Sequence, residues 1–153
     1  CWLARGQADS EVKNPLLWCI DDFSLGGSSA AKLHDNLVQL ELANKVIIID
    51  GKSADPANWP QRVDMAFIDG DHSFEGCKTD CTLSIQRGCQ CLVIHDSMSW
   101  WGPRLIKDWL QSEAGWQVLE VGFDQGLIVA MPNFNRDAIP VSYTQEEYPD
   151  GRV

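Results

Sequence analysis

Two acids and a histidine stand within four residues in the stretch FIDGDHSFEG, which begins at Phe67. Asp69 and His72 follow an apolar run, and a second histidine–acid pair, His95-Asp96, follows another apolar run further along the chain. Carboxylates bind hard cations and accept hydrogen bonds, whereas an imidazole can accept a proton near neutral pH. These residue types indicate a site for cation binding, hydroxyl binding or proton transfer.

The elements that must position these residues alternate between strand and helix. Runs rich in Val, Ile and Leu predict strands, and apolar residues at helical spacing predict helices. A hairpin is predicted at Asp124-Gln125-Gly126. This order predicts an α/β domain with a mostly parallel sheet, helices on both faces and a C-terminal antiparallel hairpin. The expected strands are 16–20, 46–49, 63–68, 89–94, 116–122 and 127–131, and the expected helices are 30–42, 74–86 and 103–113.

Acidic residues follow four of the predicted strands: Asp21-Asp22, Asp50, Asp69 and His95-Asp96 stand at those ends. In open α/β sheets, ligands bind at the carboxyl ends of the strands. Several carboxylates on one rim are unfavourable unless a ligand or a cation compensates them. The rim is therefore predicted to be the functional site.

Composition limits what such a site binds. The chain has 153 residues, a net charge of −10 and a pI near 4.5, which argues against binding to a nucleic-acid backbone. No apolar run approaches the roughly 20 residues of a membrane span, and no signal-peptide pattern opens the chain. We expect a cytoplasmic protein with a small-molecule partner, no nucleic acid and no membrane, and homo-oligomerisation stays open.

Six cysteines allow two interpretations. Cys77 and Cys81 are four residues apart on a predicted helix, and Cys89 and Cys91 share one face of a predicted strand. No CxxC pair occurs, and no second ligand pair follows at zinc-finger spacing. A metal cluster of these four residues is the alternative. Small buried side chains in a reducing compartment are the favoured interpretation.

Four segments in order, WCIDDF, IIIDGKS, VDMAFIDGDHSFEGCKTD and LVIHDS, resemble a class I S-adenosylmethionine-dependent methyltransferase. The group it resembles has an IDGDHSYEG-like signature and occurs with sugar and antibiotic O-methyltransferases; here Phe74 replaces its usual Tyr. The resemblance covers residues 1–132 and implies a Rossmann-like domain, followed by a polar tail at 133–153. It implies metal-assisted methyl transfer from S-adenosylmethionine to a hydroxyl of a sugar or another small polyol.

The resemblance also implies a cofactor site. Asp21 matches the acid that binds the ribose hydroxyls, and one carboxylate can accept from two vicinal hydroxyls. Gly51, Lys52 and Ser53 match the loop beside the adenine, where glycine permits close backbone approach. Asp69 is placed among the cofactor-binding residues as well. A solvated strand-end acid and an ordinary turn are the alternative interpretations.

The same resemblance assigns Asp69, His95 and Asp96 to a divalent cation and His72 to base catalysis. Oxygen ligands favour Mg²⁺, whereas a histidine nitrogen favours Mn²⁺ or another transition ion, unless His95 lies outside the ligand set. The alternative for His72 is a helix N-terminal histidine bonded to Asp69 or Asp71. Asp71 itself is either a partner of the site or an acid at a helix N-terminus.

The chain departs from the resemblance at its start. Residues 1–6 resemble the end of the glycine-rich loop and the beginning of the first helix, and the first strand of the fold is missing. Its loss is expected to leave two neighbouring strands with unpaired edges. The sequence is thus interpreted as a fragment that binds the cofactor poorly by itself.

Other functions stay open at this point. They are a catechol-type O-methyltransferase, a degenerate domain without catalysis and, less favoured, a metal-dependent hydrolase. Trp100 and Trp101 follow the His95-Asp96 pair and fit the wall of a flat ring or of a sugar face equally well.

Overall fold

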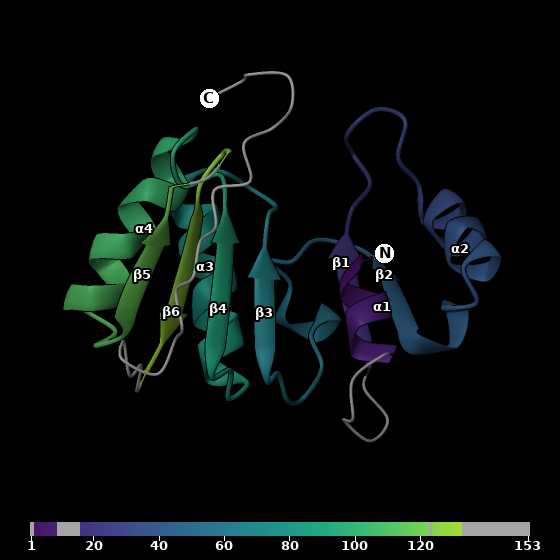
Figure 1. Cartoon of the computed structure of the whole chain (residues 1–153), viewed down its shortest axis with the longest axis horizontal. Helices are drawn as coiled ribbons and strands as arrows, with labels where there is room; N and C mark the ends of the chain where they lie inside the picture. Colours follow the sequence, from purple (N-terminus) through teal and green to yellow (C-terminus); the bar gives the residue numbers. More distant parts are fainter. Residues whose placement is uncertain (1, 9–15, 123, 133–153) are drawn as a thin grey trace, which may run out of the picture.

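Two β-sheets stand in a row in the computed structural model, which describes residues 2–8, 16–122 and 124–132 (Figure 1). The smaller sheet pairs β1 (Leu17–Asp21) with β2 (Val46–Asp50) in parallel. In the larger sheet β3 and β4 are parallel, whereas β6 is antiparallel to both β4 and β5. The predicted mostly parallel sheet with a terminal hairpin is confirmed. The strands of the larger sheet, in spatial order, are β3 (Met65–Ile68), β4 (Cys91–His95), β6 (Leu127–Met131) and β5 (Gln117–Val121).

Helices lie on both sides of this row of strands (Figure 1). The short helix α1 packs on β1 and β2 through Ala4, which is fully buried. On the opposite side, α3 and α4 pack against each other and against the larger sheet. None of the described helices is long and apolar enough to cross a membrane. The helices are α1 (Trp2–Ala8), α2 (Ala30–Gln39), α3 (Phe74–Gln86) and α4 (Trp101–Ser112), with 3-10 turns η1 (Ala43–Lys45) and η2 (Pro56–Asn58).

Helix α2 ends three residues earlier than its apolar spacing predicts. Glu41 adopts a left-handed conformation with a φ of 59°. The Leu42 amide then donates to the Leu37 carbonyl oxygen at 2.8 Å, and the Glu41 amide donates to the Val38 carbonyl oxygen at 3.1 Å. This is the Schellman arrangement that closes many helices. Leu42 reaches the core through this turn rather than through another turn of helix. Its apolar side chain therefore fits the helical spacing although the helix has already ended.

The larger core contains three of the cysteines. Cys77, Cys81 and Cys89 are buried among the apolar side chains that α3 and α4 direct at the larger sheet. In the described part of the chain, the cysteines are free thiols and form no cluster with metal-ligand spacing. Their interpretation as small buried side chains is therefore supported over the metal cluster.

β1 and β3 are neighbours in the row but are not paired (Figure 1). Within the described ranges, β1 pairs with β2 alone and β3 with β4 alone, so each of these two strands has one edge without a strand partner. The loop after β2 connects the two sheets. Trp59 in this loop packs on the larger core, and the Arg87 guanidinium donates to the Pro56 carbonyl oxygen at 2.9 Å.

Candidate functional site

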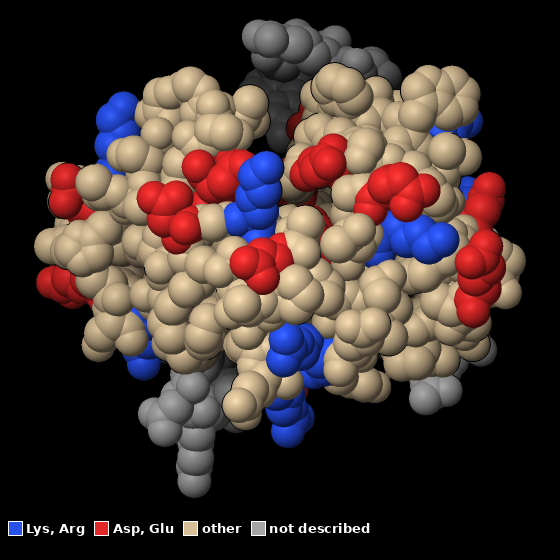
Figure 2. Space-filling model, turned by 180° about the vertical axis from the view of Figure 1, so that it is seen from behind, with Lys and Arg blue, Asp and Glu red and all other residues tan. Residues whose placement is uncertain are grey.

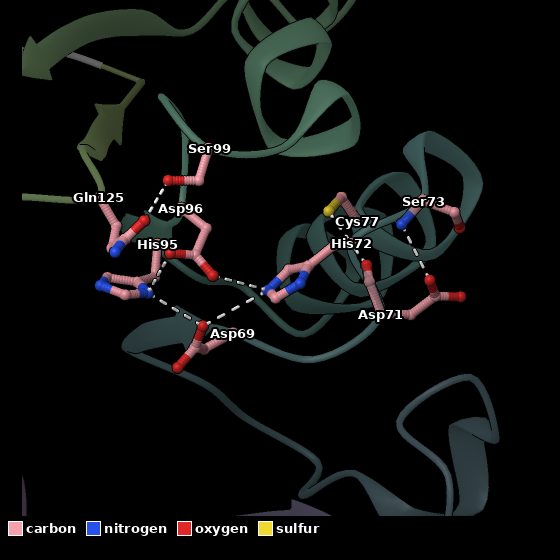
Figure 3. Close-up of polar contacts among 9 residues, drawn as sticks. All are labelled: Asp69, Asp71, His72, Ser73, Cys77, His95, Asp96, Ser99 and Gln125. Carbon is pink, nitrogen blue, oxygen red and sulfur yellow. Dashed lines mark hydrogen bonds and ion pairs between the residues drawn. The ribbon is translucent and has the colours of Figure 1, made fainter. Parts of the chain in front are cut away.

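The pairing of β3 with β4 brings the two acidic motifs together. Ile68 is the register partner of Ile94, so Asp69 and His95 emerge side by side at the carboxyl ends of these strands. His95 Nδ1 lies 3.1 Å from Asp69 Oδ1 and also 3.1 Å from Asp96 Oδ1 (Figure 3). Residues 26 positions apart in the sequence thus share one rim.

Asp96 is held in a left-handed backbone conformation, with a φ of 62°. Residues other than glycine are uncommon in this region, so surrounding contacts have to maintain it. The backbone amides of Ser99 and Trp100 each donate to the Asp96 carbonyl oxygen at 3.1 Å. This turn directs the Asp96 carboxylate toward His72 (Figure 3).

The turn between β5 and β6 supports the turn that follows Asp96. The Met98 amide donates to the Gln125 carbonyl oxygen at 2.9 Å, and the Ser97 amide donates to the Gly126 carbonyl oxygen at 3.4 Å. A Cβ atom on Gly126 would lie 2.9 Å from Met98 N, and its φ of 82° also favours glycine. The hairpin therefore packs closely against the site and fixes the backbone beside Asp96.

His72 lies between β3 and α3 and faces both carboxylates. Its Nε2 is 3.1 Å from Asp96 Oδ2 and 3.6 Å from Asp69 Oδ1 (Figure 3). The imidazole stacks on Trp100, with 5.3 Å between the ring centroids and 24° between the ring planes. The first turn of α4 also touches the His72 backbone, because a Cβ atom on Gly102 would overlap the His72 carbonyl oxygen. Helix α4 thus fixes both the ring and the backbone of His72.

The cluster is partly buried and carries two carboxylates. The side chain of Asp96 is only 14% exposed, whereas that of Asp69 is 44% exposed. His72 Nε2 is buried and, although it lies at ion-pair distance from Asp96 Oδ2, it forms no hydrogen bond among the described residues. A buried polar atom without a partner is costly unless it binds a ligand or an ion. Ligand atoms of Asp69, His72 and Asp96 all lie within 4.8 Å of one another, so this donor set fits a divalent cation.

Acidic side chains gather in one half of the molecule. Figure 2 shows the face opposite to that of Figure 1, where Asp and Glu side chains lie mainly along the upper half, with Lys and Arg side chains among them. The carboxyl ends of β1, β3 and β4 point to this half of the molecule (Figure 1).

Asp71 does not belong to this cluster. Its Oδ1 accepts from the Ser73 amide at 2.9 Å, and its carboxylate lies against Gly76 in the first turn of α3 (Figure 3). Ser73 caps the same helix by accepting from the Gly76 amide at 3.0 Å. Of the two interpretations of Asp71, the structure supports the acid at a helix N-terminus.

Four of the residues predicted to bind the cofactor, Asp21, Gly51, Lys52 and Ser53, gather at the rim of the smaller sheet, whereas the fifth, Asp69, lies in the histidine–acid cluster after β3. The Asp21 carbonyl oxygen accepts from the Gly51 amide at 3.0 Å, and the Asp21 carboxylate accepts from the Phe23 amide at 2.8 Å. Lys52 and Ser53 follow Gly51 in a loop that Trp59 Nε1 holds by donating to the Ser53 carbonyl oxygen. The structure thus forms two groups on one rim, the predicted cofactor group on β1 and β2 and the histidine–acid cluster on β3 and β4.

Two residues near the site were missed or left without a role by sequence reasoning. Asp80 on α3 is 6% exposed, and burial raises the pKa of its carboxyl, while a hydrogen bond from Ser53 opposes this rise. The sequence signal that could have identified Asp80 as a buried acid was its position between Cys77 and Cys81, on the buried face of a helix. Trp100 was noted only as a candidate wall, because its stacking on His72 depends on the turn after Asp96.

Comparisons with known proteins identify the fold. No family model and no curated protein matches the chain. A structure described as a candidate rRNA methylase from Clostridium thermocellum has a TM-score of 0.59 and 12% identity, over 78% of this chain and 76% of that one. A candidate caffeoyl-CoA O-methyltransferase from Staphylococcus aureus has a TM-score of 0.56 and 16% identity, over 77% of this chain and 65% of that one. The chain therefore has a Rossmann-like methyltransferase fold, as the sequence motifs predicted, and spans less than two thirds of the second relative.

Proposed function

We propose that the chain acts in an S-adenosylmethionine-dependent O-methyltransferase whose acceptor is a hydroxyl of a sugar or another small polyol. The observation that carries this proposal is the cluster of Asp69, His72 and Asp96 at the rim of a methyltransferase fold. An imidazole beside two carboxylates is suited to remove a hydroxyl proton. The net charge of −10 disfavours an RNA acceptor or a phosphate-bearing one.

Asp21 and the loop of Gly51, Lys52 and Ser53 are proposed to bind the adenosine part of the cofactor. The hydroxyl oxygen of the acceptor attacks the sulfonium methyl group, so a C–O bond forms while the C–S bond breaks. The hydroxyl proton passes to His72 Nε2, and the products are a methyl ether and S-adenosylhomocysteine. Positioning of the two reactants supplies much of the rate.

Asp69 and Asp96, with one of the two nearby histidines, would hold a divalent cation. The sequence resemblance assigns this third place to His95, whose Nδ1 lies 3.1 Å from both carboxylates. When bound, such a cation lowers the pKa of a hydroxyl group and so favours loss of its proton.

A catechol-type acceptor is the second candidate. Trp100 and Trp101 are 54% and 75% exposed beside the cluster, and a flat aromatic ring can stack on such a surface. Transfer of labelled methyl groups to methyl glycosides or to catechols distinguishes the two acceptor classes.

The direct test is calorimetry of S-adenosylmethionine binding to the full-length protein, with and without Mg²⁺. Asp21→Ala is expected to weaken binding by about tenfold or more, because a charge-assisted hydrogen bond to the ribose is lost. The matched control is Asp22→Ala, which removes the neighbouring carboxylate and should change the affinity little. Equal losses in both variants would remove Asp21 from the site, and no binding by the folded protein would reject the proposed function.

A further inference from the structure

We propose that His72, rather than His95, supplies the nitrogen ligand of the cation site, together with Asp69 and Asp96. The site then takes a borderline transition ion such as Mn²⁺ in preference to Mg²⁺. This inference deepens the proposed function and rests on it for the use of the cation in catalysis. The geometry that supports this inference is the arrangement of the possible ligand atoms, which does not depend on the proposed methyl transfer.

Two of the three distances between the ligand atoms match those around a single ion, and the whole set lies within 4.8 Å. His72 Nε2 is 3.1 Å from Asp96 Oδ2 and 3.6 Å from Asp69 Oδ1. Ligands that each lie about 2.0–2.2 Å from one ion stand roughly 3–4 Å apart at neighbouring corners of a tetrahedron or an octahedron. One cation can therefore contact all three residues without a large movement of the backbone.

The buried Nε2 of His72 points to a ligand as well. This atom lies at ion-pair distance from both carboxylates, 3.1 Å from Asp96 Oδ2 and 3.6 Å from Asp69 Oδ1, but it forms no hydrogen bond within the described part of the chain. Trp100 stacks on the ring and holds this atom in place. A cation between the imidazole and the carboxylates would satisfy the nitrogen and neutralise the paired acids together.

His95 is placed to orient the carboxylates. Asp96 divides its two oxygens between the histidines, with Oδ1 3.1 Å from His95 Nδ1 and Oδ2 3.1 Å from His72 Nε2. His95 Nδ1 also has hydrogen-bond geometry with Asp69 Oδ1. A partner that hydrogen-bonds to ligating carboxylates fixes their orientation and supports metal affinity without being a ligand.

A nitrogen ligand changes the preferred ion. Imidazole favours transition ions, whereas Mg²⁺ prefers oxygen ligands. The same lone pair of His72 cannot hold an ion and accept a proton at once. His72 would therefore serve either as a ligand or as the base, and the experiment below distinguishes the two roles.

The experiment uses MnCl₂ and MgCl₂ alone on the full-length protein, with calorimetry for affinity and pulsed EPR of Mn²⁺ for a directly bound nitrogen. The unaltered protein should bind Mn²⁺ at least about tenfold more tightly than Mg²⁺ and show one ¹⁴N coupling.

His72→Gln and His95→Asn form a matched pair, because each amide nitrogen takes roughly the place of the ring nitrogen that faces the carboxylates. His72→Gln should lose the ¹⁴N coupling, whereas His95→Asn should keep it and bind about tenfold more weakly. The control is His34→Ala, which alters an exposed histidine on α2 and should change neither measurement.

A coupling that survives in His72→Gln and disappears in His95→Asn would overturn the inference in favour of His95. Mn²⁺ bound through oxygen alone, or no Mn²⁺ binding, would overturn it too. S-adenosylmethionine calorimetry on the same preparations separates the two proposals. Cofactor binding without a nitrogen-ligated ion leaves the proposed function intact, and a nitrogen-ligated ion without cofactor binding rejects only that function.

Discussion

Single residues show how burial controls chemistry in this protein. The carboxylates and imidazoles at the strand ends are only partly buried, and they are the groups proposed to react. The thiols of Cys77 and Cys81, both on α3, lie instead in the larger core. Burial, followed by the charges of Asp80 and Asp71, raises the pKa of Cys77 to about 12, and burial raises the pKa of Cys81 strongly.

These two thiols should resist alkylation in the native protein. At pH 8 a thiol with such a raised pKa is almost entirely protonated, and the thiolate is the reactive form. Iodoacetamide followed by peptide mass spectrometry should leave Cys77 and Cys81 unmodified in buffer. Both should react in concentrated urea, where unfolding restores an ordinary pKa. Rapid labelling of Cys81 in the native protein would contradict the buried placement.

At the scale of elements, two supports position the site. The turn between β5 and β6 fixes the backbone after Asp96, and the first turn of α4 contacts the loop that carries His72. Both supports require a glycine at the point of contact. At position 126, glycine is required both by the positive φ and by the close approach of neighbouring atoms. At position 102, glycine is required by the close approach alone.

Gly102→Ala should destabilise the protein although alanine favours helix formation over glycine. Its Cβ atom would lie 2.7 Å from the Phe74 amide nitrogen and would overlap other backbone atoms, so α4 must shift away from His72. Overpacking of this kind costs about 1–3 kcal/mol in the free energy of unfolding. Urea denaturation measures the loss. In the control Gly26→Ala no atom lies within 4 Å of the new Cβ, so little change is expected; equal midpoints for both variants would contradict the close contact.

At the scale of the whole molecule, the two sheets differ in how well they are supported. The larger sheet has a core of many buried residues from β3, β4, β6, α3 and α4. The smaller sheet relies on Ala4, Leu37 and Leu42 as its fully buried members. The two sheets are not joined by strand pairing within the described ranges, and the loop after β2 links them.

Hydrogen exchange should therefore divide the chain into two units. Local stability follows the number of buried apolar contacts and paired amides. Amides of β4 and β6, which are paired on both sides, should exchange slowest, and those of β1 and β2 should exchange at least about tenfold faster. Mass spectrometry of deuterated peptides measures this difference. Equal protection in both sheets would show that they unfold as one unit.

The sequence by itself determined the elements and the rim. Runs such as Val46–Asp50 become strands, here half-buried, because β-branched side chains suit a pleated sheet. Acids placed directly after such runs must reach the carboxyl edge of the sheet, whatever the packing is. The methyltransferase fold could also be predicted from the sequence, because each motif that carries the resemblance is a short continuous segment of the chain.

Only the tertiary structure decided which side chains face each other on that rim. The sequence resemblance named His95 as a candidate ligand of the cation. In the structure His95 Nδ1 lies beside both carboxylates, and His72 Nε2 faces them too. That orientation depends on the left-handed turn at Asp96 and on the stacking of Trp100. Both arise from contacts with α4 and with the β5–β6 turn, which lie far away in sequence. Strand ends are set by local patterns, whereas side-chain directions in the loops beyond them are set by long-range packing.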